Sequence, residues 1–250
     1  MHYGICTLSV VPVRSLADDT SEMVTQLLYG DYFKILEKRK KWSKIRIGFD
    51  RYEGWICNKQ VFDLSEEDYK KLESSKQNGY SADLVAHIST EDDKLIPIVL
   101  GSLIAKIANL PHHFEGNTTN GQVEKVELIN TALLYLNAPY LWGGKTPFGI
   151  DCSGLTQMVY RINGHCLKRN AAEQATQGEA LSFIEESEPG DLAFFDNAEG
   201  VIDHVGLIMK NNYIIHAHGK VRIDRLDHTG IFNTEENRYT HKLRVIKKIL

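Results

Sequence analysis

One cysteine has the surroundings that a nucleophile needs. Cys152 follows Asp151 and precedes the small residues Ser153 and Gly154, at the point where a predicted helix begins. The N-terminus of a helix favours a thiolate over a thiol, and its unpaired backbone N–H groups can stabilise an oxyanion. A buried, unreactive side chain is the usual alternative for a single cysteine, so a catalytic role also requires a base nearby.

Two short apolar runs on either side of Lys210-Asn211 predict a β-hairpin that supplies such a base. Because paired residues in a tight hairpin keep a constant sum of residue numbers, His204 should lie opposite residues 216–219. His204 thereby becomes a neighbour of His216 or His218. A general base that is held by a second polar residue is the arrangement that activates a cysteine nucleophile.

The chain around these residues has an α+β pattern. Apolar residues recur at three- and four-residue steps after Asn120, which predicts a helix that Asn120 caps and that ends before Pro139. A second helix is expected from Cys152 to Gly164. Strands are expected over residues 192–195, 204–209, 213–218 and 242–250. Helices followed by a meander of strands indicate an α+β domain.

The beginning of the chain is predicted to be all-β. Within residues 42–49, Ile45, Ile47 and Phe49 share one face of a strand, while charged side chains occupy the other. Residues 1–62 resemble a bacterial SH3-like barrel, on four segments along their length. These segments are Val13–Ser15, Leu28–Asp31, Trp42–Arg46 and Tyr52–Trp55.

Residues 63–122 have a weaker pattern. They begin with a polar stretch, and Leu84–Leu110 then reads as short strands because Pro97 and Gly101 interrupt it. We interpret the segment as a linker, with a degenerate second SH3-like barrel as the other interpretation. His112-His113 is expected to face solvent in the linker.

Composition excludes several classes of protein. The 250 residues have a net charge of −4 and are 42% hydrophobic, so the chain is expected to be globular and to bind no nucleic acid. No apolar run approaches the ~20 residues of a membrane span. Residues 1–6 have no signal-peptide pattern, so we expect a cytoplasmic protein, or a periplasmic or secreted one if a leader has been removed. We also expect a monomer.

The carboxy-terminal half, residues 123–250, resembles the NlpC family of papain-like cell-wall peptidases. The resemblance rests on five motifs that occur in order: Tyr140–Gly144, Asp151–Gly154, Pro189–Leu192, His204–Gly206 and Ile215–Ala217. It implies a papain-like catalytic domain with Cys152 as nucleophile and His204 as general base. It also implies that His216 orients the base and that the hydroxyl of Tyr140 lies near the oxyanion.

The order of the two regions, an SH3-like barrel followed by such a domain, resembles that of the γ-D-glutamyl-L-diamino-acid endopeptidases of murein peptide recycling. This similarity implies hydrolysis of the bond between γ-D-glutamate and diaminopimelate or lysine in murein peptides with a free N-terminal L-alanine. Asp151 would meet the substrate ammonium beside Ser153, and Arg169 would hold a substrate carboxylate. The resemblance also implies that Glu22 and Tyr52 are the residues of the barrel that bind the substrate. The implied chemistry requires no cofactor and no metal.

Three other functions stay open at this stage. The chain could be a peptidoglycan-binding module with an idle catalytic domain. It could be a cell-wall amidase or acyltransferase that uses the same triad, because a triad does not define the leaving group. It could also be a zinc hydrolase in which His204, His216 and His218 bind the metal.

Overall fold

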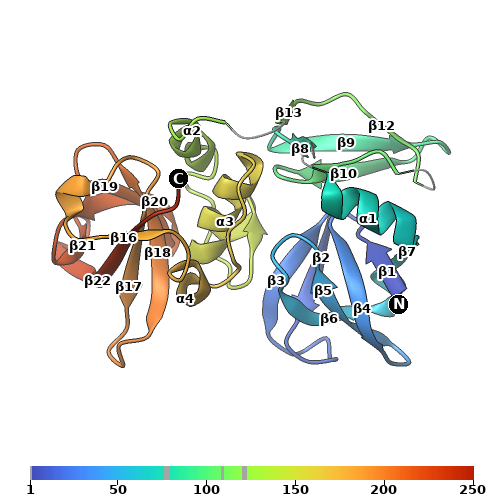
Figure 1. The fold of residues 1–250 in the computed structure, drawn as a ribbon, viewed down its shortest axis with the longest axis horizontal. Coiled ribbons are helices and arrows are strands. Elements are labelled where there is room, and N and C mark those ends of the chain that lie inside the picture. The colour runs from blue at the N-terminus through green and yellow to red at the C-terminus, as the bar shows by residue number, and fades with distance from the viewer. Residues whose placement is uncertain (1, 76–78, 108–109, 120–122) are drawn as a thin grey trace. The chain divides into compact units, whose positions relative to one another are not determined.

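The computed structural model describes residues 2–75, 79–107, 110–119 and 123–250, and it divides into two compact units (Figure 1). The first unit consists of residues 1–122 and 142–146, and the second of residues 123–141 and 147–250. The domain boundaries expected from the sequence, at residues 62 and 122, stay predictions. The structural division has no boundary at residue 62, and it also assigns residues 142–146 to the first unit.

The first unit begins with a seven-stranded sheet in the order β3-β2-β6-β5-β4-β1-β7. Its strands are β1 (His2–Ile5), β2 (Val10–Arg14), β3 (Met23–Leu28), β4 (Tyr32–Lys38), β5 (Trp42–Ile47), β6 (Glu53–Cys57) and β7 (Phe62–Leu64), with a 3-10 turn η1 at Asn58–Gln60. The predicted alternation is confirmed for Ile45 and Ile47, which are buried in the core while Arg46 is exposed. The strand ends at Ile47, so Phe49 lies half-buried in the turn that follows and not in β5.

The rest of the first unit contains a helix and two small sheets. Ser65 caps the helix α1 (Glu66–Ser74) by accepting a hydrogen bond from the backbone N–H of Asp68. The sheets have the orders β10-β9-β12 and β11-β8-β13. Their strands are β8 (Gly79–Ser81), β9 (Val85–Thr90), β10 (Leu95–Val99), β11 (Leu103–Ile104), β12 (His112–Phe114) and β13 (Thr118–Thr119).

His112-His113 lies in a strand and not in a linker, although His113 is exposed to solvent as expected and His112 is half-buried. Both residues belong to β12, where they pair with β9, and Nδ1 of His112 lies 3.3 Å from the hydroxyl of Tyr29. The small sheet thus orders a segment whose short strands carry too few residues to show a period in the sequence.

Residues 142–146, which include β14 (Lys145–Thr146), pack within the first unit although they follow it by some twenty positions. The backbone N–H of Lys145 donates a 2.8 Å hydrogen bond to Oε1 of Gln26. The side chain of Lys145 is buried, and its ammonium group lies 3.9 Å from the carboxylate of Asp31. A side chain added to Gly143 would meet the carbonyl of Met23, so glycine permits this close approach.

The second unit contains three helices and a sheet that closes on itself. The helices are α2 (Glu127–Leu133), α3 (Cys152–Ile162) and α4 (Ala171–Gln174), and the strands are β15 (Gly149–Ile150), β16 (Glu179–Leu181), β17 (Leu192–Asp196), β18 (Ile202–Met209), β19 (Tyr213–His218), β20 (Lys220–Leu226), β21 (Gly230–Asn233) and β22 (Arg238–Lys248), with a 3-10 turn η2 at Ile184–Glu186. The sheet order is β16-β22-β17-β18-β19-β20-β21, and β21 pairs with β22 as well. Strands β17 to β22 therefore form a closed, six-stranded barrel.

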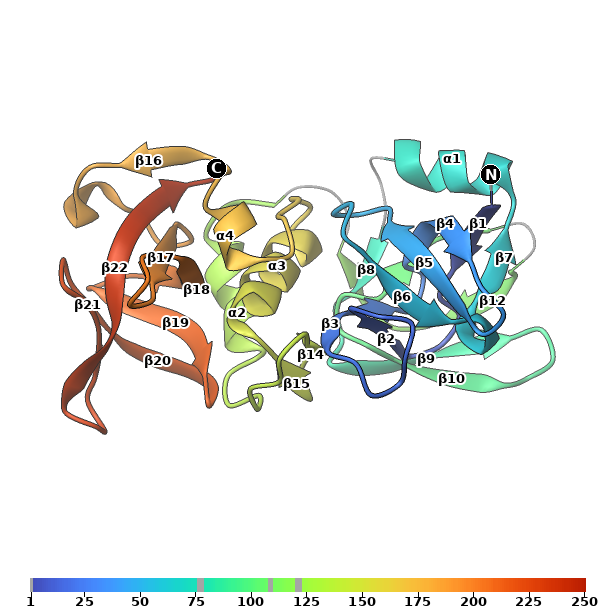
Figure 2. The same cartoon turned by 90° about the horizontal axis from the view of Figure 1, so that it is seen from below.

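The helix α3 is the central helix of this unit. Every one of its residues is buried, and it packs against β18 and β19 (Figure 2). A helix that is buried on all sides needs apolar or fully paired side chains around its whole circumference. The predicted span of this helix is confirmed, and so is the α+β class. The predicted cap Asn120 lies outside the described residues, and α2 begins later than predicted, with Val126 at its N-cap position and no side-chain cap. Among those residues, no helix combines the length and the apolar character that crossing a membrane requires.

Candidate active site

Cys152 stands at the first position of α3, directly after its cap. The carboxylate of Asp151 accepts a 2.6 Å hydrogen bond from the backbone N–H of Gly154. This cap satisfies one of the free donors of the first helical turn, as an aspartate at this position usually does. The N–H of Gly154 is consequently engaged and is not one of the donors that can serve an oxyanion.

The thiol of Cys152 lies against the backbone of β18 on either side of His204. Its sulfur is 3.8 Å from the carbonyl oxygen of Asp203. The backbone N–H groups of Val205 and Ser153 also interact with the sulfur and favour its charged form. The helix α3 thus places the candidate nucleophile beside the strand that carries the candidate base.

The predicted neighbourhood of the histidines in the hairpin is confirmed. Gly206 pairs with His216 in the register of β18 and β19, and Nε2 of His204 lies 2.8 Å from Nδ1 of His216. Both rings are buried. A side chain on Gly206 would come within 2.9 Å of Cβ of His216, so glycine at this position allows the two rings to meet.

A carboxylate continues this chain of side chains on the next strand. Oδ2 of Asp224 lies 3.0 Å from Nε2 of His216. The guanidinium of Arg222 donates hydrogen bonds of 2.7 and 3.0 Å to the two oxygens of Asp224. These bonds lower the pKa of Asp224 even though burial opposes them, so its carboxylate is ionised.

Two more histidines surround the pair. The ring of His241, on β22, stacks on His204 with a centroid distance of 4.0 Å and an interplanar angle of 21°. The ring of His218 meets His241 edge-on at 4.8 Å. One nitrogen each of His204, His216 and His241 lies within 4.8 Å of the others. The lone pairs of two stacked imidazole rings lie in nearly parallel planes and do not converge on one point. His204 and His241 would therefore have to move before both could bind one metal ion.

Burial decides the protonation state of the candidate catalytic pair. It raises the pKa of the Cys152 thiol to about 12, and the negative charge of Asp151 adds to this effect. Burial also lowers the pKa of His204 well below its usual value, with further contributions from the neighbouring histidines. Desolvation therefore opposes the thiolate that the N-terminus of the helix favours. Burial thus favours the neutral form of both groups.

Asp151 and Arg169 bind each other. The two terminal nitrogens of Arg169 lie 3.0 and 2.6 Å from the two oxygens of Asp151, and the first also lies 3.0 Å from Oγ of Ser153. All three side chains are buried. The sequence assigned the ammonium of a substrate to Asp151 and the carboxylate of a substrate to Arg169. In the structure the guanidinium compensates the charge of Asp151, and both roles stay predictions.

The remaining predicted residues divide between the two units. Tyr140 forms a backbone bridge to Ile150 in the second unit, and burial raises the pKa of its hydroxyl to about 12. In the first unit, the carboxylate of Glu22 accepts a 2.7 Å hydrogen bond from Nε1 of Trp142. Tyr52 is half-buried against the core of the first sheet. The hydrogen bond from Trp142 orients Glu22, and the roles expected for Tyr140, Glu22 and Tyr52 stay predictions.

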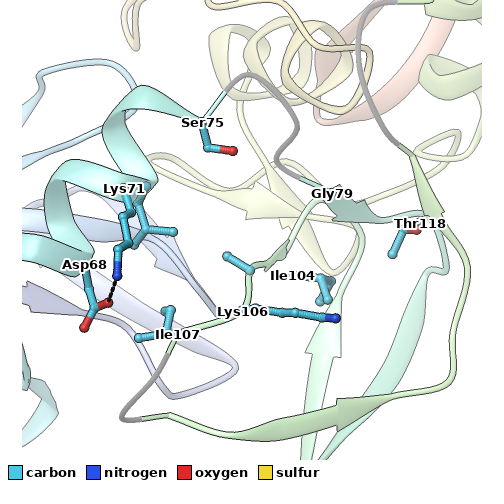
Figure 3. Close-up of a pocket in the computed structure, with 10 residues that line it drawn as sticks. Asp68, Lys71, Ser75, Gly79, Ile104, Lys106, Ile107 and Thr118 are labelled. Carbon is cyan, nitrogen blue, oxygen red and sulfur yellow. Dashed lines mark ion pairs between the residues drawn. The ribbon is translucent and has the colours of Figure 1, made fainter.

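Two pockets lie apart from these groups. In the first unit, a pocket borders α1 and β11, and Lys71 at its edge pairs with Asp68 (Figure 3). In the second unit, an apolar pocket borders α2 and the hairpin of β18 and β19, with Ile129 and Met209 in its lining. Neither lining includes a residue that the sequence assigned to chemistry.

Comparison with known proteins identifies the families that two regions of the chain match. Residues 137–240 match the NlpC/P60 family, and residues 13–61 match the bacterial dipeptidyl-peptidase SH3 domain. The chain carries an NlpC/P60 cysteine peptidase domain. A γ-D-glutamyl-L-lysine dipeptidyl-peptidase of Bacillus subtilis is 25% identical over 86% of this chain and 74% of its own length. Dipeptidyl-peptidase 6 of Lysinibacillus sphaericus is 27% identical over 83% of this chain and 85% of its own.

A solved NlpC/P60 family structure from Bacillus cereus shares the fold, with a TM-score of 0.82 and 20% identity over 99% of both chains. The match to the NlpC/P60 domain runs past Cys152 and both hairpin histidines and ends just before His241. The SH3 match includes Glu22 and Tyr52. The comparisons therefore confirm the predicted order, an SH3-like region followed by an NlpC-type peptidase domain.

Sequence reasoning missed two residues of this NlpC/P60 site, Asp224 and His241. A usable signal existed for Asp224: the turn at Gly219 pairs His216 with Arg222, which puts Asp224 one step along the same face of β20. His241 had no such signal. Its strand reaches the site only because β22 closes the barrel.

Proposed function

We propose that this protein hydrolyses the bond between γ-D-glutamate and an L-diamino acid in murein peptides. The observation that carries the proposal is the thiol of Cys152 against the β18 backbone that flanks His204, with the ring of His204 hydrogen-bonded to His216. The named activities of two relatives, which align over most of this chain, supply the bond type. The diamino acid would be lysine or diaminopimelate.

With both groups in the neutral forms that burial favours, the reaction begins with a proton transfer. When a substrate carbonyl approaches, the thiol proton passes to the unprotonated nitrogen of His204 while the sulfur of Cys152 forms a bond to the carbonyl carbon. The hydroxyl of Tyr140 and backbone N–H groups stabilise the oxyanion. The imidazolium then donates its proton to the departing amine, which leaves a thioester. A water molecule gives a proton to His204 and attacks the thioester, and the imidazolium returns this proton to the sulfur as the acid leaves.

We further propose that the substrate has a free N-terminal L-alanine. The support is chemical: the relatives' names describe dipeptidyl-peptidases, which remove a dipeptide from an amino terminus. Because Arg169 compensates Asp151, selection for an ammonium group cannot depend on the charge of Asp151 alone. Glu22, which Trp142 orients within the first unit, is a second candidate carboxylate.

The test is mass spectrometry of products after incubation with soluble murein tri- and tetrapeptides. We expect release of L-Ala-γ-D-Glu from peptides with a free amine, and much slower release from the matched N-acetylated peptides. The Cys152→Ala variant is the control for contaminating activity. Cleavage of a different bond, such as an amide next to muramic acid, would favour the amidase alternative, and binding to sacculi without any turnover would favour an idle module.

A further inference from the structure

A chain of hydrogen-bonded side chains extends from the candidate base to a buried carboxylate. Nε2 of His204 contacts Nδ1 of His216, at 2.8 Å, and Nε2 of His216 contacts Oδ2 of Asp224, at 3.0 Å. The three residues come from three successive strands, β18, β19 and β20. Both distances are those of hydrogen bonds. The group at the end of the chain determines which nitrogen donates in each bond.

Asp224 can only accept. Its carboxylate receives two hydrogen bonds from Arg222, which keeps it in the ionised form, and an ionised carboxylate has no proton to donate. The nitrogen that faces it, Nε2 of His216, must therefore carry a hydrogen. Both histidines are buried beside each other, and burial favours their neutral forms. A neutral His216 that is protonated at Nε2 has a bare lone pair at Nδ1.

The same step applies once more along the chain. Because Nδ1 of His216 accepts, Nε2 of His204 must donate, and a neutral His204 that is protonated at Nε2 has its lone pair at Nδ1. This is the nitrogen on the ring that does not contact His216. A proton acceptor on the base is thus available at Nδ1, which the proposed transfer from the thiol requires.

We propose that Asp224 is a positioning residue that acts through His216 to hold His204 in the tautomer with a free Nδ1. The inference rests on the proposed function, since it assigns a base to the cysteine reaction. Asp224 touches neither thiol nor substrate, and its effect is transmitted by the order of protons in the chain. Without Asp224, His216 could present either nitrogen as donor, and part of the population of His204 would carry its proton at Nδ1.

A purely structural role is the competing explanation. Asp224 forms an ion pair with Arg222, which also contacts Asn233 and Glu235. On that view Asp224→Ala would weaken the packing of β20 without regard to His216. The two explanations differ in one respect that can be measured, because a role through His216 disappears when His216 is absent.

The first measurement needs no variant of Asp224. In protein labelled with ¹⁵N-histidine, the ring-nitrogen shifts report which nitrogen of each imidazole carries the proton, and the His204→Ala and His216→Ala spectra assign the signals. We expect both His204 and His216 to be protonated at Nε2 at neutral pH. Protonation of His204 at Nδ1 in the unmodified enzyme would overturn the proposal, whether or not any peptide is cleaved.

The second measurement is a double-mutant cycle of kcat on the cleaved peptide. We expect Asp224→Ala to lower kcat by roughly 10- to 100-fold with little change in KM, less than the ~10⁴-fold cost of disturbing the carboxylate next to a catalytic histidine. Asp224→Asn, which keeps the volume, guards against a folding defect. In the His216→Ala background, Asp224→Ala should change kcat by less than about twofold, because no tautomer is left to select.

Glu235→Ala is the matched control. It removes the other carboxylate from Arg222, and Glu235 lies largely exposed, so kcat should stay within about twofold of the unmodified enzyme. Additive losses in the cycle, or equal effects of Asp224→Ala and Glu235→Ala, would show that Asp224 is structural. If the unmodified enzyme cleaves no murein peptide, the proposed function fails, while the ¹⁵N spectrum still decides the proton order.

Discussion

The buried pair of Asp151 and Arg169 allows a quantitative prediction for Arg169→Met. Arg169 is 1% exposed and donates hydrogen bonds of 3.0 and 2.6 Å to the carboxylate of Asp151. Methionine keeps much of the volume but leaves the carboxylate without its guanidinium. Breaking one side of a buried pair costs about 3–5 kcal/mol. Because Gly154 and Ser153 still donate hydrogen bonds to Asp151, we expect the lower end, about 3 kcal/mol.

The assay is thermal unfolding of the full chain. In a chain of this size, 1 kcal/mol corresponds to about 2–4 °C, so we expect the midpoint to fall by roughly 6–12 °C. The double variant Asp151→Asn with Arg169→Met should lose less than the sum of the single variants, since no charge remains to be buried. Lys168→Met, at the exposed neighbouring position, is the control. Additive losses, or a midpoint within 1 °C of the unmodified protein for Arg169→Met, would refute the reasoning.

Further predictions concern the candidate catalytic residues. Cys152→Ala should reduce turnover to background with an unchanged unfolding midpoint, and more than a tenth of the original kcat/KM in this variant would refute a cysteine mechanism. Iodoacetamide should inactivate the unmodified enzyme, and a chelator should not. His204→Ala should cost more kcat than His216→Ala, because the base moves the proton and its neighbour only orients it. Since the pKa of His204 is lowered, the acid limb of the kcat/KM profile should lie below pH 6.5. Burial lowers the pKa of His241 to about 3, so the unfolded chain binds the extra proton, and the free energy of unfolding measured by urea titration should fall as the pH drops from 6.5 towards 3.

The elements that place the nucleophile could be predicted because their causes are local. Asp151 caps the helix through a bond three residues along the chain. The turn between β18 and β19 determines which of their residues face each other, and it includes Asn212 in addition to the predicted Lys210-Asn211. Periodicity, capping and turn length are all visible in a short stretch of sequence. The pairing of His204 with His216 follows from them and from the absence of a side chain on Gly206.

The protonation state of the site could not be predicted in this way. The sequence places Cys152 at the favourable end of a helix, which by itself indicates a thiolate. In the folded unit the thiol is buried, and desolvation raises its pKa instead. Burial depends on everything that packs around α3, and no local pattern contains that information.

The sequence alone determined that this protein has a cysteine at a helix start, a histidine hairpin after it, and an SH3-like region ahead. Only the tertiary structure decided which side chains complete the site. Arg169 forms an ion pair with Asp151, which lies 18 residues earlier in the sequence. His241 stacks on His204 because β22 pairs with both β17 and β21. Contacts of this kind form between residues far apart in sequence, and they exist because closing the barrel removes its open edges and buries the polar groups that must then find partners.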